Sequence, residues 1–243
     1  MMFRVLFFTA VIIFPTLAVA EPLNVSIGSA GSSLTSNIVQ IIAITTILSL
    51  APSILVMVTS FTRIIVVLSL LRSALGLQTT PPNTVLISLA LFLTMFIMQP
   101  VFTEAYDQAI HPLMQGQIKE EEAFTKGIAP FKVFMLKHTR GKDLSLFLRL
   151  NDKTKIEKPE DTPITTLIPA FMISELKRAF EIGFLIFVPF LIIDMLVASV
   201  LMAMGMMMLP PVVVSLPFKI IFFVLIDGWY MIAGSLIQSY GAT

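Results

Sequence analysis

The sequence predicts an all-α membrane protein, built from kinked helical hairpins with about four hydrophobic segments and a helical extracytoplasmic insert. Three observations predict this fold class. Of the 243 residues, 56% are hydrophobic and only 13% are charged, whereas soluble domains carry about 25% charged residues. The mean hydropathy is high, at +0.93. The charges are also unevenly placed, because only Arg63 and Arg72 are charged between Glu21 and Glu104.

The first 20 residues predict a signal peptide. Arg4 supplies a positive charge, residues 5–17 form an apolar run, and Ala18-Val19-Ala20 is a small-residue cleavage site. The alternative is a transmembrane anchor, but the apolar run is too short for one and ends in a cleavage signal. Residues 21–37 are rich in Ser, Gly and Asn, and we expect them to form a flexible extracytoplasmic tail.

Four segments approach the roughly 20 apolar residues that a membrane-spanning helix needs: Ile38–Val58, Val85–Phe102, Gly183–Met208 and Val212–Leu236. The signal peptide places the start of the first segment outside the membrane. Arg63 and Arg72 then fall near its cytoplasmic end, which agrees with the tendency of Lys and Arg to stay inside. We therefore expect a first hydrophobic hairpin over residues 38–103 and a second over residues 164–243.

Residues 104–163, between the two hairpins, are expected to form a charged helical insert outside the membrane. Ten basic and ten acidic residues lie between Glu104 and Asp161. Apolar residues three and four apart predict helices near residues 119–138 and 142–150. Phe134 and Phe147 lie in these helices, where they pack within the insert or contact another copy of the chain.

A charged cluster precedes the third hydrophobic segment. Glu175, Arg178 and Glu181 are three residues apart and share one helix face. They form either a solvated cap on the segment or a contact between subunits. Lys219 stands alone within a later apolar run, and an unpaired charge at membrane depth is costly. Glu175 and Glu181 are therefore candidate partners for Lys219.

Two carboxylates, Asp194 and Asp227, lie inside predicted hydrophobic segments. An intramembrane carboxylate indicates a proton or ion relay, a structural hydrogen bond or ion pair, or exposure in a polar pore. The sequence leaves these three alternatives open.

Methionines gather near the end of the third hydrophobic segment. Five of the 15 methionines fall within residues 202–208, and the run ends in Met206, Met207 and Met208. Gly205 and the following Pro210-Pro211 predict that the chain leaves the helix and forms a loop there. Methionine is flexible and polarizable, so a ring of such loops could close a pore. Ordinary packing or contact with lipid is the alternative.

The composition excludes several functions. The absence of cysteine excludes a disulfide framework and thiolate chemistry, and two histidines, His111 and His138, do not suggest a metal site. A net charge of +1 provides no basic field for nucleic acid, and no nucleotide-binding or hydrolase motif occurs. The sequence predicts a protein that is not an enzyme and has no metal, cofactor or nucleic-acid partner.

Several motifs in order along the chain resemble those of the FliP family of flagellar biosynthetic proteins. They are Ser60–Ile65, Pro81-Pro82-Asn83, Pro169–Phe184, Pro189–Asp194, Gly205–Met208, Pro210-Pro211, Pro217-Phe218-Lys219 and Asp227-Gly228-Trp229. Together they are highly specific, and the charged insert is the part least similar to the family.

The resemblance implies a subunit of the type III protein export gate, in the bacterial inner membrane at the core of the flagellar basal body. Several copies, a pentamer by resemblance, would join FliQ and FliR in a helical, cone-like oligomer, with FlhB and FlhA alongside. Unfolded flagellar subunits would pass through it toward the periplasm, into which the assembly protrudes. Its helices would lie largely above the bilayer plane, and only some would contact membrane lipid.

The resemblance also implies roles for single residues. Met206, Met207 and Met208 would form a gasket that closes the channel at rest. Glu175 and Lys219 would form a salt bridge between neighbouring copies. The remaining polar residues would then be structural groups that take no part in ion chemistry. They are Asp194, Asp227, Arg178 and Glu181. The alternative functions are an ion-coupled secondary transporter, a structural assembly platform, and the homologous gate subunit of a virulence-type secretion system.

Overall fold

The computed structural model of the chain describes residues 34–150, 161–206 and 208–241. The predicted signal peptide, most of the predicted tail and Met207 lie outside these residues. The chain divides into two units, residues 1–49 and 50–243. Within the first unit, the described residues form the beginning of helix α2 (Leu34–Met57), whose exposed side chains there include Ile38, Val39 and Ile42.

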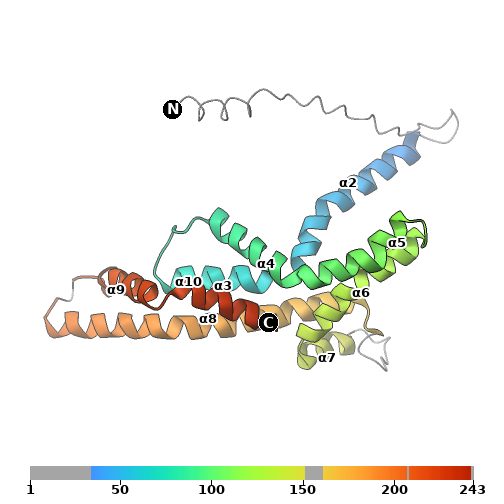
Figure 1. The fold of residues 1–243 in the computed structure, drawn as a ribbon. Helices are drawn as coiled ribbons and strands as arrows, with labels where there is room; N and C mark the ends of the chain where they lie inside the picture. Colours follow the sequence, from blue (N-terminus) through green and yellow to red (C-terminus); the bar gives the residue numbers. More distant parts are fainter. Residues whose placement is uncertain (1–33, 151–160, 207, 242–243) are drawn as a thin grey trace, which may run out of the picture. The chain divides into compact units, whose positions relative to one another are not determined.

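The second unit consists of helices wherever it is described (Figure 1). After α2 follow α3 (Phe61–Ala74), α4 (Asn83–Ala105), the π-helical turn η1 (Tyr106–Ile110), α5 (His111–Met114), α6 (Glu120–His138), α7 (Gly141–Leu150), α8 (Ile164–Ala203), α9 (Pro211–Leu225) and α10 (Gly228–Gln238). No strand occurs in the described parts of the chain. The prediction of an all-α protein is confirmed.

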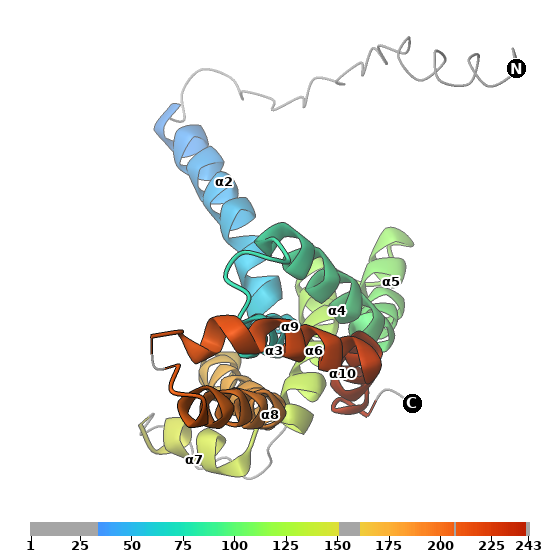
Figure 2. The ribbon, with the colours of Figure 1, turned by 90° about the vertical axis from the view of Figure 1, so that its left-hand side faces the viewer.

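Helix α8 is the longest element and organises the second unit. Its 40 residues extend over about 60 Å at 1.5 Å per residue, which is about twice the thickness of a bilayer's hydrocarbon core. Helix α3 packs along α8, and both ribbon views place α9 and α10 on one side of α8 and α7 on the other (Figures 1 and 2). Pro169 and Pro189 lie within α8 without ending it.

The described residues include two helices that are long and apolar enough to cross a membrane, Asn83–Met114 and Ile164–Ala203. The pair α9 and α10, bent by 63° at a short break, gives a third if the two form one span. Two of the four segments predicted from the sequence lie on these helices and a third on the bent pair, so the number of four stays a prediction. The remaining predicted segment, Ile38–Val58, lies on α2, part of whose side chains the structure does not describe.

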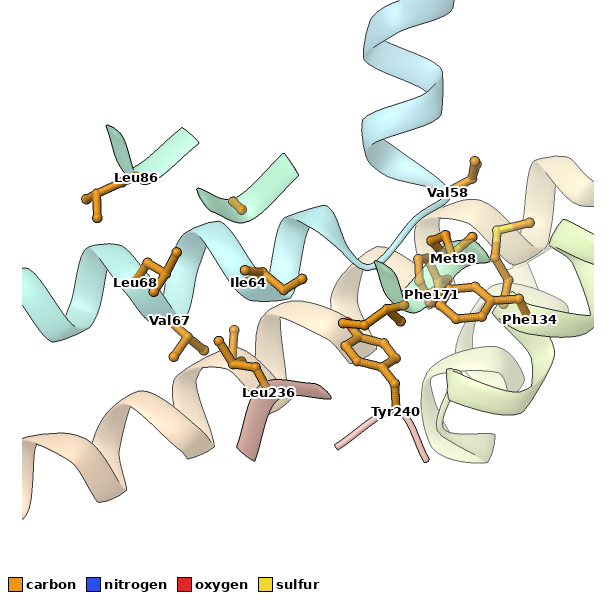
Figure 3. Packing of buried hydrophobic residues seen from close by; sticks show 14 of the residues in the cluster. Val58, Ile64, Val67, Leu68, Leu86, Met98, Phe134, Phe171, Leu236 and Tyr240 are labelled. Atoms are coloured by element: carbon orange, nitrogen blue, oxygen red, sulfur yellow. The ribbon is translucent and has the colours of Figure 1, made fainter. Parts of the chain in front are cut away.

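The main hydrophobic core lies where α3 and α8 meet, with side chains from α4, α6 and the C-terminal end of α10 (Figure 3). Ile64, Val67 and Phe171 are fully shielded from solvent there. Close packing of such side chains supplies most of the stability of a helical assembly. The core also holds α3 against α8 beside the buried charged residue that each of these helices carries.

The predicted helices of the charged insert are present as α6 and α7. The first turn of α6 contains Glu120, Glu121 and Glu122, and its last turn contains Lys137 and His138. The three glutamates and Lys137 are thereby each placed favourably for the helix dipole. One feature was not predicted: the helix that starts at Asn83 continues through η1 and α5 to Met114, well beyond the expected end at Phe102.

Candidate functional site

A fully buried ion pair joins α3 to α8. Arg63 and Glu175 are both 0% exposed. Arg63 Nε lies 2.9 Å from Glu175 Oε2, and a second guanidinium nitrogen donates to Glu175 Oε1. Such a two-pronged contact uses the planar geometry of both groups and fixes their orientation. The pair therefore holds α3 and α8 in one register.

The C-terminal end of the described chain completes this polar cluster. The Tyr240 hydroxyl donates to Glu175 Oε2, and Arg63 Nη1 donates to Ser239 Oγ at 2.9 Å. The Arg63 guanidinium also lies 3.8 Å from the centre of the Tyr240 ring, a favourable cation–π arrangement. We call Arg63, Glu175, Ser239 and Tyr240 the buried hub. It connects α3, α8 and the segment after α10.

A second polar contact attaches the insert to α8, one residue before Glu175. Ser174 Oγ donates to Asp143 Oδ2 at 2.6 Å and accepts a bond from the Arg140 backbone N–H at 3.0 Å. Arg140 also pairs with Asp143, with Nε 2.8 Å from Oδ2. Burial alone would raise the pKa of Asp143, but the bonds from Ser174 and Arg140 lower it overall. Asp143 thus stays ionised and holds the start of α7 against α8.

His138 lies between the hub and the insert. Its ring is 4.7 Å from the ring of Phe134 and 4.9 Å from that of Tyr240, centre to centre. Burial, together with the positive charges of Arg63, Lys137 and Arg178, lowers the pKa of His138 to about 4. The imidazole is therefore neutral at pH 7 in the folded protein.

We expect folding stability to fall below pH 6.5 because of His138. The unfolded chain binds a proton near pH 6.5, whereas the folded chain does so near pH 4. Between these pH values protonation of His138 therefore stabilises the unfolded state relative to the folded state. At pH 5 this lowers the free energy of unfolding by about 2 kcal/mol. The variant His138→Phe should lack this component, and the exposed His111→Gln variant should keep it. Thermal unfolding in detergent between pH 7.5 and 5 checks this. Parallel curves for wild type and His138→Phe would contradict it.

A second ion pair, between a buried lysine and a half-buried aspartate, joins α8 to α9. Lys219 is 4% exposed, and its Nζ lies 2.6 Å from Asp194 Oδ2. Ser215 Oγ donates to the other oxygen of Asp194. Lys219 Nζ also donates to the carbonyl of Ala74, at the end of α3, at 3.2 Å. Lys219 thus connects three helices within one chain.

The predicted salt bridge between copies, Glu175 with Lys219, stays a prediction, but its premise is corrected. Lys219 seemed to need an external partner because it stands alone in an apolar run. Within the chain it pairs with Asp194, and Glu175 pairs with Arg63. Neither charge needs a second copy to be neutralised.

The other polar residues singled out in the sequence lie apart. Glu181 is exposed and pairs with Lys177 at 3.0 Å. Arg178 is half-buried, and its Nε is buried without a hydrogen-bond partner among the described residues. Asp227 is exposed and adopts the left-handed conformation, with φ of 50°, at the break before α10. The structure does not bring Asp194, Lys219 and Asp227 to one site.

The two phenylalanines of the insert differ in environment. Phe134 is 8% exposed and contacts the rings of Phe171 and Tyr240, at 6.0 and 5.9 Å between centres. Packing within the chain therefore accounts for Phe134, and little of it is left for another copy. Phe147 is half-buried, and its contact with another copy stays a prediction.

The methionine run forms a loop between α8 and α9. Helix α8 ends at Ala203, and Gly205 adopts φ of +75°. The Met206 N–H bonds to the Leu201 carbonyl at 3.0 Å, which is how a left-handed glycine ends a helix. Helix α9 begins at Pro211. Met206 and Met208 are 40% and 98% exposed, and Met207 is not described.

Sequence reasoning missed the hub and the Asp194–Lys219 pair for different reasons. Arg63 was placed near the cytoplasmic end of the first hydrophobic segment, and it lies 112 residues from Glu175 in sequence, so no local pattern connects them. The second pair had a usable signal. Asp194 and Lys219 are nearly equidistant from the loop at Met206, and residues so placed face each other in an antiparallel helix pair.

The fold and these sites define a helical protein with apolar helices that could span a membrane, in which Asp194 and Lys219 pair within the chain and Met206 and Met208 are exposed. Residues 34–150, 161–206 and 208–241 contain no cluster of acidic or histidine side chains that could hold a metal. The sequence model of the FliP family matches residues 44–236. The chain belongs to the FliP family.

Curated relatives agree with this assignment. The flagellar biosynthetic protein FliP of Caulobacter vibrioides is 56% identical over 229 residues, which is 94% of this chain and 86% of the relative. The protein of the same name from Bacillus subtilis is 58% identical over 205 residues, or 84% of this chain and 93% of the relative. The one from Aquifex aeolicus is 50% identical over 204 residues, or 83% and 85%.

Proposed function

We propose that the chain is a channel-forming subunit of the flagellar type III protein export gate. In this role, unfolded flagellar subunits cross the inner membrane through it, and its methionine loop closes the pore at rest. Membership of the FliP family is the observation that carries the proposal. The relatives' shared name, flagellar biosynthetic protein, favours a flagellar role over a virulence-type secretion system.

The methionine loop suits the role of a deformable seal. It joins two apolar helices, α8 and α9, and Met208 is almost fully exposed. A large exposed apolar side chain that packs on nothing within its own chain is available to contact others. Flexible thioether side chains can repack as a translocating chain passes. Met206, Met207 and Met208 from several copies would then meet on the axis of the pore.

Assembly with other chains is part of this proposal. Both α8 and α9 expose large apolar side chains along their length, among them Phe184, Leu185 and Val213. Further copies of the chain, FliQ and FliR, with FlhB and FlhA alongside, would cover some of this surface, and lipid the rest. The charged insert would lie on the periplasmic side, toward which the assembly protrudes. Electron cryomicroscopy of the co-expressed proteins tests this; a monomer in every preparation would contradict it.

Replacing Met206, Met207 and Met208 with glycine should make the resting gate leak ions. Glycine removes the side chains that fill the axis and leaves the loop free to adopt the same path. We expect a severalfold rise in ion flux through the assembled gate in liposomes, and slower growth of cells that express it.

The matched control replaces the same three residues with leucine. Leucine keeps an apolar side chain of similar volume, so the gate should stay closed to ions. Equal flux through the glycine, leucine and wild-type gates would assign the methionines to packing and would contradict the seal.

The observed ion pairs weigh against ion-coupled transport. A transporter would need Asp194, Lys219 and Asp227 around one cavity. Asp194 and Lys219 instead neutralise each other, and Asp227 is exposed at a helix break. This supports structural roles for all three residues. Replacing Asp227 with asparagine should leave export unchanged, whereas a coupling residue would abolish it.

A further inference from the structure

Met208 is the most exposed large apolar side chain among the described residues, at 98%. It lies in the loop that follows Gly205, the left-handed residue after the end of α8. The Leu209 N–H bonds to the Met206 carbonyl at 3.4 Å, so the chain turns here and places Met208 at the tip of the turn. The described parts of its own chain therefore leave the Met208 side chain almost unshielded.

Methionine is the only oxidisable sulfur residue of this protein. The chain contains 15 methionines and no cysteine, so no thiol competes with the thioethers for an oxidant. Oxidation of such groups follows their exposure, and the methionines differ widely in it. Met98 and Met135 are 0% and 1% exposed, whereas Met114 is 76% and Met208 is 98% exposed. Among the described thioethers, the fold leaves that of Met208 most accessible to an oxidant.

The reaction with a peroxide is a two-electron oxygen transfer. The Met208 sulfur attacks one oxygen of hydrogen peroxide, the O–O bond breaks, and the proton of the transferred oxygen passes to the departing hydroxide. The products are the methionine sulfoxide and water, so the sulfur is oxidised and the peroxide is reduced. Methionine sulfoxide reductases reverse the step. In that direction the oxygen leaves as water, and a dithiol is oxidised to a disulfide.

Oxidation makes the tip of the methionine loop polar. The thioether of methionine is apolar and flexible, whereas the sulfoxide carries an oxygen that accepts hydrogen bonds. Surrounding this oxygen with apolar side chains costs free energy unless it finds a donor, so a sulfoxide in an apolar constriction favours the entry of water. Apolar constrictions block ions by excluding water. A sulfoxide at such a constriction therefore lowers the barrier to ions.

We propose that Met208 is a reversible oxidation site through which peroxide opens the resting gate to ions. The proposal rests on the proposed seal by the methionine loop, because a sulfoxide outside a pore would not change ion flux. Oxidation of Met208 itself requires only its exposed side chain, so it can be measured separately from the flux.

The test measures oxidation and ion flux on the same sample, the assembled gate in liposomes. Hydrogen peroxide is added at graded concentrations, and peptide mass spectrometry quantifies the added oxygen at each methionine. Met208 and Met114 should be oxidised on the order of tenfold faster than Met98 and Met135. Ion flux through the wild-type gate should rise severalfold as Met208 is oxidised. Methionine sulfoxide reductases A and B with dithiothreitol should return the flux to its resting value.

Three variants assign the change in flux to one sulfur atom. Met208→Leu keeps an apolar side chain of similar volume and should stay closed to ions in peroxide. Met208→Gln places a polar group at the tip of the loop and should leak without any oxidant. Met114→Gln is the matched control, because Met114 is also exposed but lies at the end of α5. Its replacement should leave the flux unchanged.

Three results would overturn the proposal. Absence of oxygen on Met208 after peroxide treatment would mean that the assembled gate shields this side chain. Equal peroxide-induced flux in Met208→Leu and wild type would assign the opening to another residue. Full oxidation of Met208 without a rise in flux, in a gate whose triple glycine variant leaks, would mean that the seal tolerates a polar tip. If the triple glycine variant did not leak either, the seal itself would be contradicted, and this variant therefore distinguishes the two failures.

Discussion

Replacing Arg63 with methionine is expected to destabilise the protein by about 3–5 kcal/mol. Methionine fills much of the volume of arginine but leaves Glu175, which is 0% exposed, without its cation. The remaining donor to that carboxylate is the Tyr240 hydroxyl. A buried charge without a counter-charge is among the largest destabilising effects of a single substitution. Thermal unfolding in detergent should show a midpoint lower by on the order of 10 °C.

The matched control for this variant is on the same helix. Arg72 is half-buried and donates hydrogen bonds to Asn83 Oδ1 at 2.6 Å and to the Pro81 carbonyl. Arg72→Met therefore leaves no buried charge without a counter-charge and should lower the free energy of unfolding by about 1 kcal/mol or less. The double variant Arg63→Met with Glu175→Leu should recover most of the lost stability, because both charges are gone. If Arg63→Met cost no more than Arg72→Met, the hub would not be a structural ion pair.

Hydrophobic periodicity and helix-breaking glycine and proline residues predicted most of the helices. The insert helices α6 and α7 follow from apolar residues three and four apart, and the loop before α9 follows from Gly205 and two prolines. The continuous length of α8 was not predicted, because the charged cluster at Glu175 was taken to precede the third hydrophobic segment, which was expected to begin at Gly183. The structure explains this cluster differently: one carboxylate turns inward to Arg63, while Lys177 and Glu181 pair on the exposed side.

Pairing between distant residues was the part that sequence reasoning could not supply. A lone lysine in an apolar run indicates that a partner exists, because an unpaired charge there is costly. This free-energy cost does not identify the partner. Glu175 and Glu181 were the candidate partners for Lys219, although the helix–loop–helix geometry brings Asp194 opposite Lys219. Tyr240 gave no signal, since its role depends on α10 running back along α8 to the hub. Side-chain patterns report local structure, whereas the hub depends on tertiary packing.

Replacing Gly228 with alanine is the second variant with a large expected effect. A Cβ atom at this position would lie 2.1 Å from Cε2 of Phe223. The Phe223 ring cannot move away freely, because the rings of Trp229 and Phe190 lie 5.4 and 6.4 Å from it. Forcing a methyl group into a packed site costs about 1–3 kcal/mol. Trp229 is the only tryptophan of the chain, so a shift of its fluorescence and a lower unfolding midpoint should accompany each other.

Gly234, six residues further along α10, provides the opposite expectation from the same chemical change. A Cβ atom there meets nothing within 4 Å, and alanine is favoured over glycine within a helix by about 1 kcal/mol. Gly234→Ala should therefore stabilise the protein slightly and leave the Trp229 emission unchanged. Comparing Gly228→Ala with Gly234→Ala separates the effect of side-chain packing at the bend from the effect of helix propensity. If both variants stabilised α10 equally, Phe223 could yield to a methyl group, and the close contact at Gly228 would not be what fixes the bend.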